Sequence, residues 1–289
     1  MEREPLHLHH REELSGKLNT ICGRLSEFSF ANLYLFRNVH GYELVRENDC
    51  VFITGTTNDK QKFVLPLCDH KHPDIDHLKE MIRRFGMLFP VSDCSLRYFD
   101  PREFDVYHNE DDSDYIYTVE KMATYSGRKL SKKRNLLKQF FSQYEHECLP
   151  ASEETLPAMR EILDGWQRDI LLPIEETDYH AAAEAIDLID ALNLYGFVYL
   201  IGGVPAGYLL GEDLTSDTYV LHFAKGLTEY KGLYQFMYND LARHLREKGC
   251  YLYLNFEQDL GIQSLRQAKS SYKPDHMGMK YRVTLKEKQ

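Results

Sequence analysis

The spacing of apolar residues near the C-terminus predicts a strand, a helix and a second strand in succession. Residues 218–225 are rich in strand formers whose side chains alternate between two faces. From 233 to 248 the apolar residues recur at helical spacing, and Gly249 follows, where a glycine commonly ends a helix. Residues 251–256 read as the second strand. We therefore expect the helix to pack on a sheet that contains both strands.

The stretch that follows the second strand carries the densest run of polar residues in the chain. Three of them lie at or just beyond the strand end: Asn255, Glu257 and Asp259. A helix is expected from Gly261 to Lys273, closed by Pro274. One stripe of this helix is cationic and comprises Arg266, Lys269 and Lys273. The other, about 100° away by the helical period, is apolar, is expected to face the core, and comprises Leu265, Ala268 and Tyr272.

Opposed charges around a strand end bind anions and tune proton affinity, so this stretch is our candidate site. Glu257 is the candidate general base, with Asn255 and Asp259 as further candidate catalytic residues. The cationic stripe is the candidate for binding donor phosphate. Two structural readings stay open: Asp259 as a helix N-cap, and Glu257 in an ion pair with Lys269 that only fixes the helix.

The rest of the chain predicts helices and strands in a similar order in both halves. The first half is expected to hold helices at 11–24, 28–39 and 75–89 and strands at 51–55, 63–67, 95–99 and 115–119. The second half is expected to hold helices at 130–144, 152–170 and 178–192, a hairpin of 195–201 and 204–212 around Gly202-Gly203, and a last strand at 276–285. This order predicts an α+β fold with mixed sheets and a degenerate duplication. We place the boundary near residue 125, giving domains 1–125 and 126–289.

Charge is segregated along the sequence. The net charge of -10 argues against a general affinity for nucleic acid, since phosphate binding needs clustered lysine and arginine. Between Ser126 and Lys138, however, there are six cations and no acid. The candidate polyanion-binding residues among them are Arg128, Lys132, Lys133 and Arg134. The acidic run 109–114 is expected to be a solvated loop, with a metal-binding loop as the alternative.

Neither a metal site nor a disulfide framework is indicated by the six scattered cysteines, which form no CxxC pair. His7, His9 and His10 are interpreted as an exposed terminal cluster rather than metal ligands. No run approaches the ~20 apolar residues of a spanning helix, and the N-terminus has no apolar signal core. We therefore expect a cytoplasmic protein.

Several segments resemble the family built on the C-terminal domain of phosphatidylglycerol lysyltransferases, within the GNAT (acyl-CoA N-acyltransferase) superfamily. They are 28–37 (FSFANLYLFR), 125–135 (YSGRKLSKKRN), 230–234 (YKGLY) and 255–274 (NFEQDLGIQSLRQAKSSYKP). The resemblance covers nearly the whole chain. It implies tandem GNAT-like domains and transfer of an aminoacyl group from a charged tRNA to a lipid head group. The chain lacks the large membrane domain of the lipid-modifying enzymes, which leaves the lipid acceptor open.

The donor loop departs from the superfamily's pattern. Ordinary GNAT enzymes present backbone N–H groups of a Gln/Arg-x-x-Gly-x-Gly/Ala loop to the pyrophosphate of coenzyme A at a helix N-terminus. The aligned residues here are Glu229, Gly232 and Tyr234, of which only the glycine is kept. Coenzyme A binding is thereby weakened, although Lys231, Gly232 and the helix N-terminus can still hold a phosphate.

These observations predict a transferase that moves an aminoacyl or acyl group onto an amine or hydroxyl acceptor. No tightly bound cofactor is expected, and the donor is aminoacyl-tRNA or acyl-CoA. Asn255 and Gln258 would orient the acceptor. Two alternatives remain, an acyl-CoA-dependent N-acyltransferase acting on a small amine and a non-catalytic module that binds a nucleotide or an RNA end.

Overall fold

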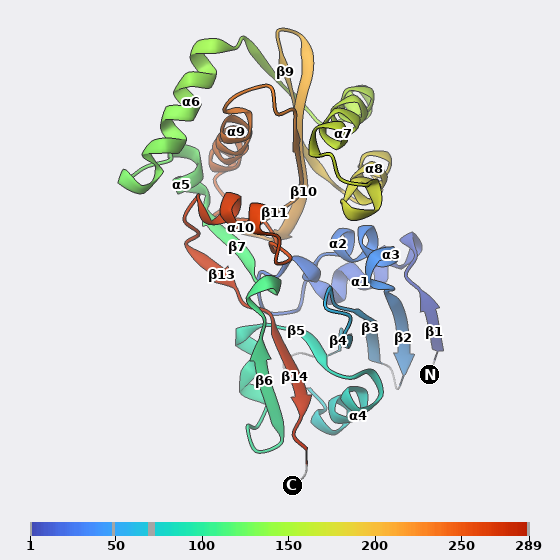
Figure 1. The fold of residues 1–289 in the computed structure, drawn as a ribbon. Coiled ribbons are helices and arrows are strands. Elements are labelled where there is room, and N and C mark those ends of the chain that lie inside the picture. The colour runs from blue at the N-terminus through green and yellow to red at the C-terminus, as the bar shows by residue number, and fades with distance from the viewer. Residues whose placement is uncertain (1, 48–49, 69–72, 288–289) are drawn as a thin grey trace. The chain divides into compact units, whose positions relative to one another are not determined.

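The computed structural model describes residues 2–47, 50–68 and 73–287, which form two compact units (Figure 1). The first unit comprises Met1–Tyr115, Gln258–Arg266 and Met277–Gln289, and the second comprises Ile116–Glu257 and Gln267–His276. This division differs from the expected boundary near residue 125 in two ways. The chain leaves the first unit ten residues earlier, inside a strand, and it returns to that unit with two segments from its C-terminal part.

The first unit is built on a sheet in the order β1-β2-β3-β4-β5-β14-β6, counting described strands. The strands are β1 (Glu2–Pro5), β2 (Glu43–Glu47), β3 (Cys50–Thr56), β4 (Lys62–Pro66), β5 (Leu88–Val91), β6 (Phe104–His108) and β14 (Tyr281–Leu285). Since β4 and β5 are parallel while β1 to β4 and the pairs of β14 are antiparallel, the sheet is mixed. The helices are α1 (Arg11–Leu18), α2 (Phe30–Leu35), α3 (Arg37–His40) and α4 (Ile75–Phe85).

Helix α4 shows how local sequence sets an element's limits. Asp74 caps its start by accepting a hydrogen bond from the His77 N–H at 3.1 Å. It ends at Phe85 because Gly86 has φ 102°, and a Cβ at Gly86 would lie 2.7 Å from the carbonyl oxygen of Lys62. The prediction of a helix over 75–89 was therefore too long, since residues 88–91 turn into strand β5.

The second unit is built on a sheet in the order β13-β7-β12-β11-β10-β9-β8, again counting described strands. The strands are β7 (Asp114–Thr118), β8 (His146–Pro150), β9 (Tyr195–Ile201), β10 (Val204–Thr215), β11 (Thr218–Gly226), β12 (Tyr253–Asn255) and β13 (His276–Gly278). The helices are α5 (Val119–Thr124), α6 (Ser131–Gln143), α7 (Leu156–Ile170), α8 (Tyr179–Asp187) and α9 (Leu233–Lys248). A further helix, α10 (Gln263–Ser270), is divided between the units, since residues up to Arg266 belong to the first and those from Gln267 to the second. β11 and β12 are parallel and α9 connects them, whereas β9 and β10 pair antiparallel with their neighbours and β7 pairs antiparallel with β12.

Helices cover both faces of the second sheet. In Figure 1, α9 lies on one side of β9 to β11, with α5 and α6 packed against it, and α7 and α8 lie on the other side. The apolar stripe of α9 is buried, including Phe236, Leu241 and Leu245. The predicted α+β class with two mixed, helix-flanked sheets is confirmed.

Four expectations about local structure were wrong. Residues 93–98 form a 3₁₀ helix instead of the strand expected at 95–99. The strand expected at 276–285 is two strands, β13 and β14, which belong to different sheets. The apolar stripe of α10 is not buried, since Leu265 is 38% exposed and Tyr272 alone of the three predicted residues is in the core. A disulfide, between Cys22 and Cys94, is present although the cysteine spacing did not indicate one.

The acidic run 109–114 also differs from the solvated loop that was expected. Asp112 and Asp114 are buried. Three of its acids pair with cations from the C-terminal part of the chain: Asp111 with Arg266, Asp112 with Arg282 and Asp114 with Lys280. The partners lie more than 150 residues away in sequence, which is why a local reading took the acids for surface groups.

Candidate functional site

The candidate site is formed by a tight turn at the end of β12. Glu257 has φ 57°, a left-handed conformation that is uncommon for residues other than glycine. Asn255 is fully buried, and its Oδ1 accepts a hydrogen bond from the Glu257 N–H at 2.7 Å. Lys269 Nζ donates to the backbone oxygens of Phe256, at 2.6 Å, and Glu257, at 3.3 Å. The turn that presents Glu257 is thus held from both sides by side chains.

The carboxylate of Glu257 ends a chain of hydrogen bonds across the sheet. Its Oε1 lies 2.7 Å from His222 Nδ1, and His222 Nε2 lies 3.0 Å from Glu212 Oε1. The His222 side chain is 0% exposed, so both ring nitrogens are committed to these two contacts. The Glu257 side chain is 12% exposed and that of Glu212 is 16% exposed, so both ends of the chain reach solvent, and Glu257 is the end that comes from the turn after β12.

Burial disfavours the charged form of the imidazole, but the hydrogen bonds that the ring donates to Glu212 and Glu257 outweigh this effect. They raise the pKa of His222 to about 10. His222 is therefore an imidazolium at neutral pH, and both ring N–H groups donate to the flanking carboxylates. An imidazolium without a lone pair cannot be a base. Its role is to orient Glu257, which leaves the Glu257 carboxylate as the group that can accept a proton from a bound molecule.

On the same strand, Lys225 forms a second buried cluster. Its side chain is 4% exposed, and its Nζ lies 2.5 Å from Asp178 Oδ1 and 3.5 Å from the centre of the Trp166 ring. Burial lowers the pKa of the Lys225 ammonium, against the attraction of Asp178. Lys225 is thus paired inside the protein, and it marks the strand end from which the candidate donor loop begins.

In the candidate donor loop, Tyr234 and Gly232 make specific contacts with neighbouring backbone. The Tyr234 hydroxyl accepts a hydrogen bond from the Gly226 N–H at 3.1 Å and donates to the Gly226 oxygen at 3.3 Å, so the ring closes over the end of β11. Gly232 has φ 88°, and a Cβ there would lie 2.7 Å from the Leu136 oxygen, which explains why this glycine is kept. Lys231 is exposed at the N-terminus of α9.

Two predicted site residues, Asp259 and Arg266, belong to the first unit and bind each other there. Arg266 donates to both Asp259 oxygens at 2.8 Å and to Asp111 at 2.6 Å, and the Tyr115 hydroxyl donates to Asp259 at 2.6 Å. Burial of Asp259 is outweighed by these hydrogen bonds, so its pKa lies below its ordinary value. Because Asp259 is fully buried and saturated with donors, this geometry gives the pair a structural role.

The remaining predicted cations divide into exposed and packed side chains. Lys269 lies against backbone carbonyls rather than an open surface, as described above, and Lys273 is exposed. Arg128 and Lys132 are exposed. Lys133 instead lies 3.7 Å from the centre of the Tyr272 ring, and burial lowers its pKa to about 8. Arg134 donates to the Gly127 oxygen at 2.7 Å, so the patch predicted to bind polyanions is smaller than its sequence suggests.

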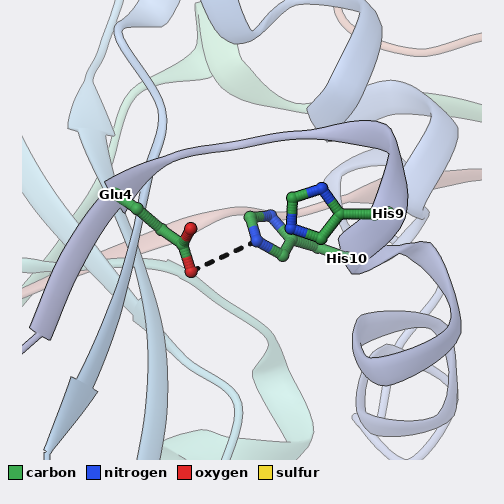
Figure 2. A group of neighbouring side chains, drawn as sticks. All are labelled: Glu4, His9 and His10. Carbon is green, nitrogen blue, oxygen red and sulfur yellow. Dashed lines mark ion pairs between the residues drawn. The ribbon is translucent and has the colours of Figure 1, made fainter.

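Of the N-terminal histidines, His7 and His9 are exposed as expected, whereas His10 is buried. Figure 2 shows Glu4, His9 and His10 close together, with an ion pair of 3.2 Å between Glu4 Oε1 and His10 Nε2. His10 is 2% exposed, and its Nδ1 accepts a hydrogen bond from the His7 N–H, which places the ring proton on Nε2. Arg46 Nη1 lies 2.5 Å from the same Glu4 oxygen. The adjacent guanidinium, which binds the carboxylate oxygen that a metal would need, disfavours a metal ion here.

His222, Glu212, Asp178 and Trp166 were not singled out from the sequence. His222 was treated as one alternating position of a strand, because its partners lie 10 and 35 residues away. The strand pairing brings Glu212 and His222 together: Glu212 pairs with Val220, two residues before His222, and the register of β10 and β11 shifts beside His222.

Comparisons with known proteins place this architecture in a family. The model of the phosphatidylglycerol lysyltransferase C-terminal family matches residues 20–284. The chain belongs to this family. A crystal structure of a conserved protein of unknown function from Bacteroides thetaiotaomicron is similar with a TM-score of 0.84 and 22% identity, covering 99% of this chain and 100% of that one. The structure of L-PGS from Bacillus licheniformis is similar with a TM-score of 0.62 and 15% identity, covering 96% of this chain and 92% of that one.

A curated relative is itself uncharacterised. An uncharacterised protein from Mycoplasmoides gallisepticum is 26% identical over 182 residues, which is 61% of this chain and 57% of the relative. The match thus spans little more than half of the relative's length. Within the described residues, no helix of this family member is long and apolar enough to cross a membrane.

Proposed function

We propose that this protein transfers an aminoacyl group from a charged tRNA onto an amine or hydroxyl acceptor, with Glu257 as general base. The observation that carries the proposal is the Glu257 carboxylate, oriented by the buried imidazolium of His222 at 2.7 Å and presented on a left-handed turn. A carboxylate fixed in this way can take a proton at a defined position. Membership of a family named for a lysyltransferase supports the reaction class.

The proposed step is balanced in atoms and charge. The acceptor's nitrogen or oxygen attacks the ester carbonyl of the aminoacyl-tRNA, a new C–N or C–O bond forms, and the ester C–O bond to the terminal ribose breaks. The acceptor's proton passes to the Glu257 carboxylate, and the protonated Glu257 then gives it to the departing ribose oxygen, which leaves as a hydroxyl and regenerates the carboxylate. Asn255 and Lys269 act as positioning residues, since they bind the turn's backbone at Glu257 and Phe256.

The donor is proposed to be tRNA because the loop before α9 is poorly suited to coenzyme A. The Tyr234 hydroxyl already hydrogen-bonds with the N–H and the oxygen of Gly226. Glu229 places a carboxylate beside the phosphate position of the superfamily loop. Lys231 and the N-terminus of α9 can bind a single phosphate. The lipid head group that the family's name suggests is one acceptor to test, and a small amine is another.

A transfer assay with matched variants tests the proposal. Aminoacyl-tRNAs prepared from the full set of amino acids are incubated with the protein and either phosphatidylglycerol vesicles or a panel of small amines. Glu257→Gln is expected to lower turnover about 10²–10⁴-fold while tRNA binding and folding stay unchanged. Glu247→Gln, at an exposed position of α9, is the control and should retain full activity.

Three outcomes would contradict the proposal. Transfer by Glu257→Gln at the wild-type rate would show that Glu257 is not the general base. Acetyl transfer from acetyl-coenzyme A, with no aminoacyl transfer, would favour an acyl-CoA-dependent N-acyltransferase. Binding of tRNA or nucleotide without turnover of either donor would favour a non-catalytic binding module.

A further inference from the structure

We propose that Cys148, Asp240 and His244 form a site for a zinc-class divalent cation in the second unit, independent of the transfer reaction. Their ligand atoms all lie within 4.8 Å of one another. Asp240 and His244 are four residues apart on α9, so both side chains lie on one face of the helix. Cys148 comes from β8, the last strand of the second sheet as described.

The spacing of the ligand atoms fits a tetrahedral ion. Zinc bonds of about 2.3 Å to sulfur and about 2.0 Å to oxygen and nitrogen place neighbouring ligands roughly 3.3–3.5 Å apart at tetrahedral angles. Cys148 Sγ lies 3.2 Å from Asp240 Oδ2, and His244 Nδ1 lies 3.5 Å from the same oxygen. Two of the three ligand pairs thus already have the spacing of a tetrahedral site, and the third pair, Cys148 with His244, lies within 4.8 Å.

The donor set selects the class of metal. A thiolate together with an imidazole and a carboxylate suits Zn²⁺ or Co²⁺ better than Mg²⁺ or Ca²⁺, which prefer oxygen ligands alone. Three protein ligands leave a fourth position for water or another ligand. The His244 side chain is 41% exposed, so solvent can reach this side of the site.

In the metal-free protein, protons occupy the positions that the ion would take. The Cys148 thiol donates to Asp240 Oδ2, and burial raises the pKa of this thiol. His244 Nδ1 lies 2.9 Å from the Asp240 backbone oxygen, so the ring proton sits on Nδ1. Metal binding at Nδ1 releases the thiol proton to solvent and moves the ring proton to Nε2. The ring of Phe197, 4.3 Å away between centroids, supports the imidazole during this change.

The ion would join the edge strand β8 to α9. Cys148 and Asp240 are 92 residues apart in sequence, so no ligand motif could be read from local spacing. The N-terminal group Glu4, His9 and His10 offers a contrast, because Arg46 competes there for the carboxylate. In the second unit Asp240 accepts a hydrogen bond from a thiol that a metal can replace.

Cobalt binding to the full chain tests the site. The reduced protein, stripped with a chelator, is titrated with Co²⁺ and followed by absorption. We expect one equivalent to produce a thiolate-to-cobalt charge-transfer band in the near ultraviolet with intense visible bands of tetrahedral cobalt. Cys148→Ser should abolish the charge-transfer band and weaken binding by about 100-fold or more. Cys250→Ser, at an exposed cysteine, is the matched control and should keep both.

A second measurement distinguishes loss of the metal site from a folding defect in Cys148→Ser. The melting temperature of the wild-type protein should rise with added Zn²⁺, since an ion that binds the folded state alone stabilises it, and the rise should be lost in Asp240→Asn. Absence of the charge-transfer band in the wild-type protein, or its persistence in Cys148→Ser, would overturn the proposal. A band that depends on Cys148 together with a zinc-dependent melting temperature would establish it.

Discussion

Each unit contains a buried cation held between two carboxylates, Lys280 in the first and His222 in the second, yet the two clusters differ in what they can do. In the first unit, Lys280 lies 2.7 Å from both Glu27 and Asp114, and its side chain is 0% exposed. Its ammonium also donates to Ser26 and to Gln258. Every group of this cluster thus faces another group of the same cluster, and no member is presented to a ligand.

In the second unit, His222 is equally buried, but both of its carboxylates are partly exposed, and one of them, Glu257, lies on a left-handed turn. The comparison teaches that a buried ion cluster does not by itself indicate a site. What distinguishes the candidate site is an acceptor oxygen at its edge, backed by a cation and held by backbone hydrogen bonds. The predictions below test whether this difference is real.

The largest effect is expected from Lys280→Met. The change leaves Glu27 and Asp114 buried without their cation, which should lower the free energy of unfolding by about 3–5 kcal/mol. Urea unfolding at neutral pH measures it. Lys286→Met, whose side chain is 45% exposed, is the control and should cost less than about 0.5 kcal/mol. Equal losses in both variants would mean that Lys280 is no more buried in solution than the surface residue Lys286.

A smaller loss, about 2–3 kcal/mol, is expected from His222→Gln, because Glu212 and Glu257 can recruit water at the exposed edge. The loss should depend on pH. The folded-state pKa of His222, about 10, lies above its ordinary 6.5, so its contribution is complete below pH 6.5 and disappears as pH rises to about 10. Unfolding of the wild type and the variant across this range measures the difference. A gap that stays constant with pH would show that His222 is not charged.

The first cluster should titrate in a different window. Burial raises the pKa of Glu27 to about 7 from an ordinary 4.5, against the opposing attraction of Lys280. The folded state therefore holds this proton more tightly, and wild-type stability should fall by about 1–3 kcal/mol between pH 4.5 and pH 7. Glu27→Gln should remove that part of the slope. Identical pH profiles for the two proteins would contradict the assignment.

The smallest effects are expected for the cations near α6, where the exposed Lys132 and the packed Lys133 have different roles. Lys132→Ala should weaken tRNA binding slightly and reduce the slope of log affinity against log salt by about 0.7–0.9. Lys133→Ala should leave that slope unchanged and cost about 1 kcal/mol of stability through the lost contact with Tyr272. Filter binding at several salt concentrations measures the first effect. Equal slopes for Lys132→Ala and the wild type would show that the predicted polyanion-binding patch does not bind tRNA.

Sequence periodicity was sufficient where an element's pattern was long. The helix expected at 233–248 has those limits in the structure, because its apolar stripe repeats over four turns and Gly249 ends it with φ 77°. Short patterns were less dependable: the strand predicted at 195–201 has those limits as β9, whereas the strand predicted at 276–285 does not exist as one element. Residues 276–285 alternate like one strand, but the alternation cannot show that β13 and β14 hydrogen-bond to different sheets.

The candidate site was predictable only in part. Asn255, Glu257 and Lys269 do lie together, since they follow one another closely in sequence. The contacts differ from those expected: Lys269 holds backbone oxygens, and the partner of Glu257 is His222, from a strand 35 residues earlier. That partnership depends on strand pairing, which side-chain spacing along one segment does not contain. The catalytic role of these residues stays a prediction.

The position of β14 between β5 and β6 has a consequence for synthesis on the ribosome. The second unit lies mostly in the middle of the chain and can begin to fold while later codons are still being read. The sheet of the first unit cannot be completed until residue 285, the end of β14, has left the exit tunnel. A nascent chain stalled after residue 275 would therefore expose the unpaired edges of β5 and β6, which makes late translation the period when this protein most needs a chaperone.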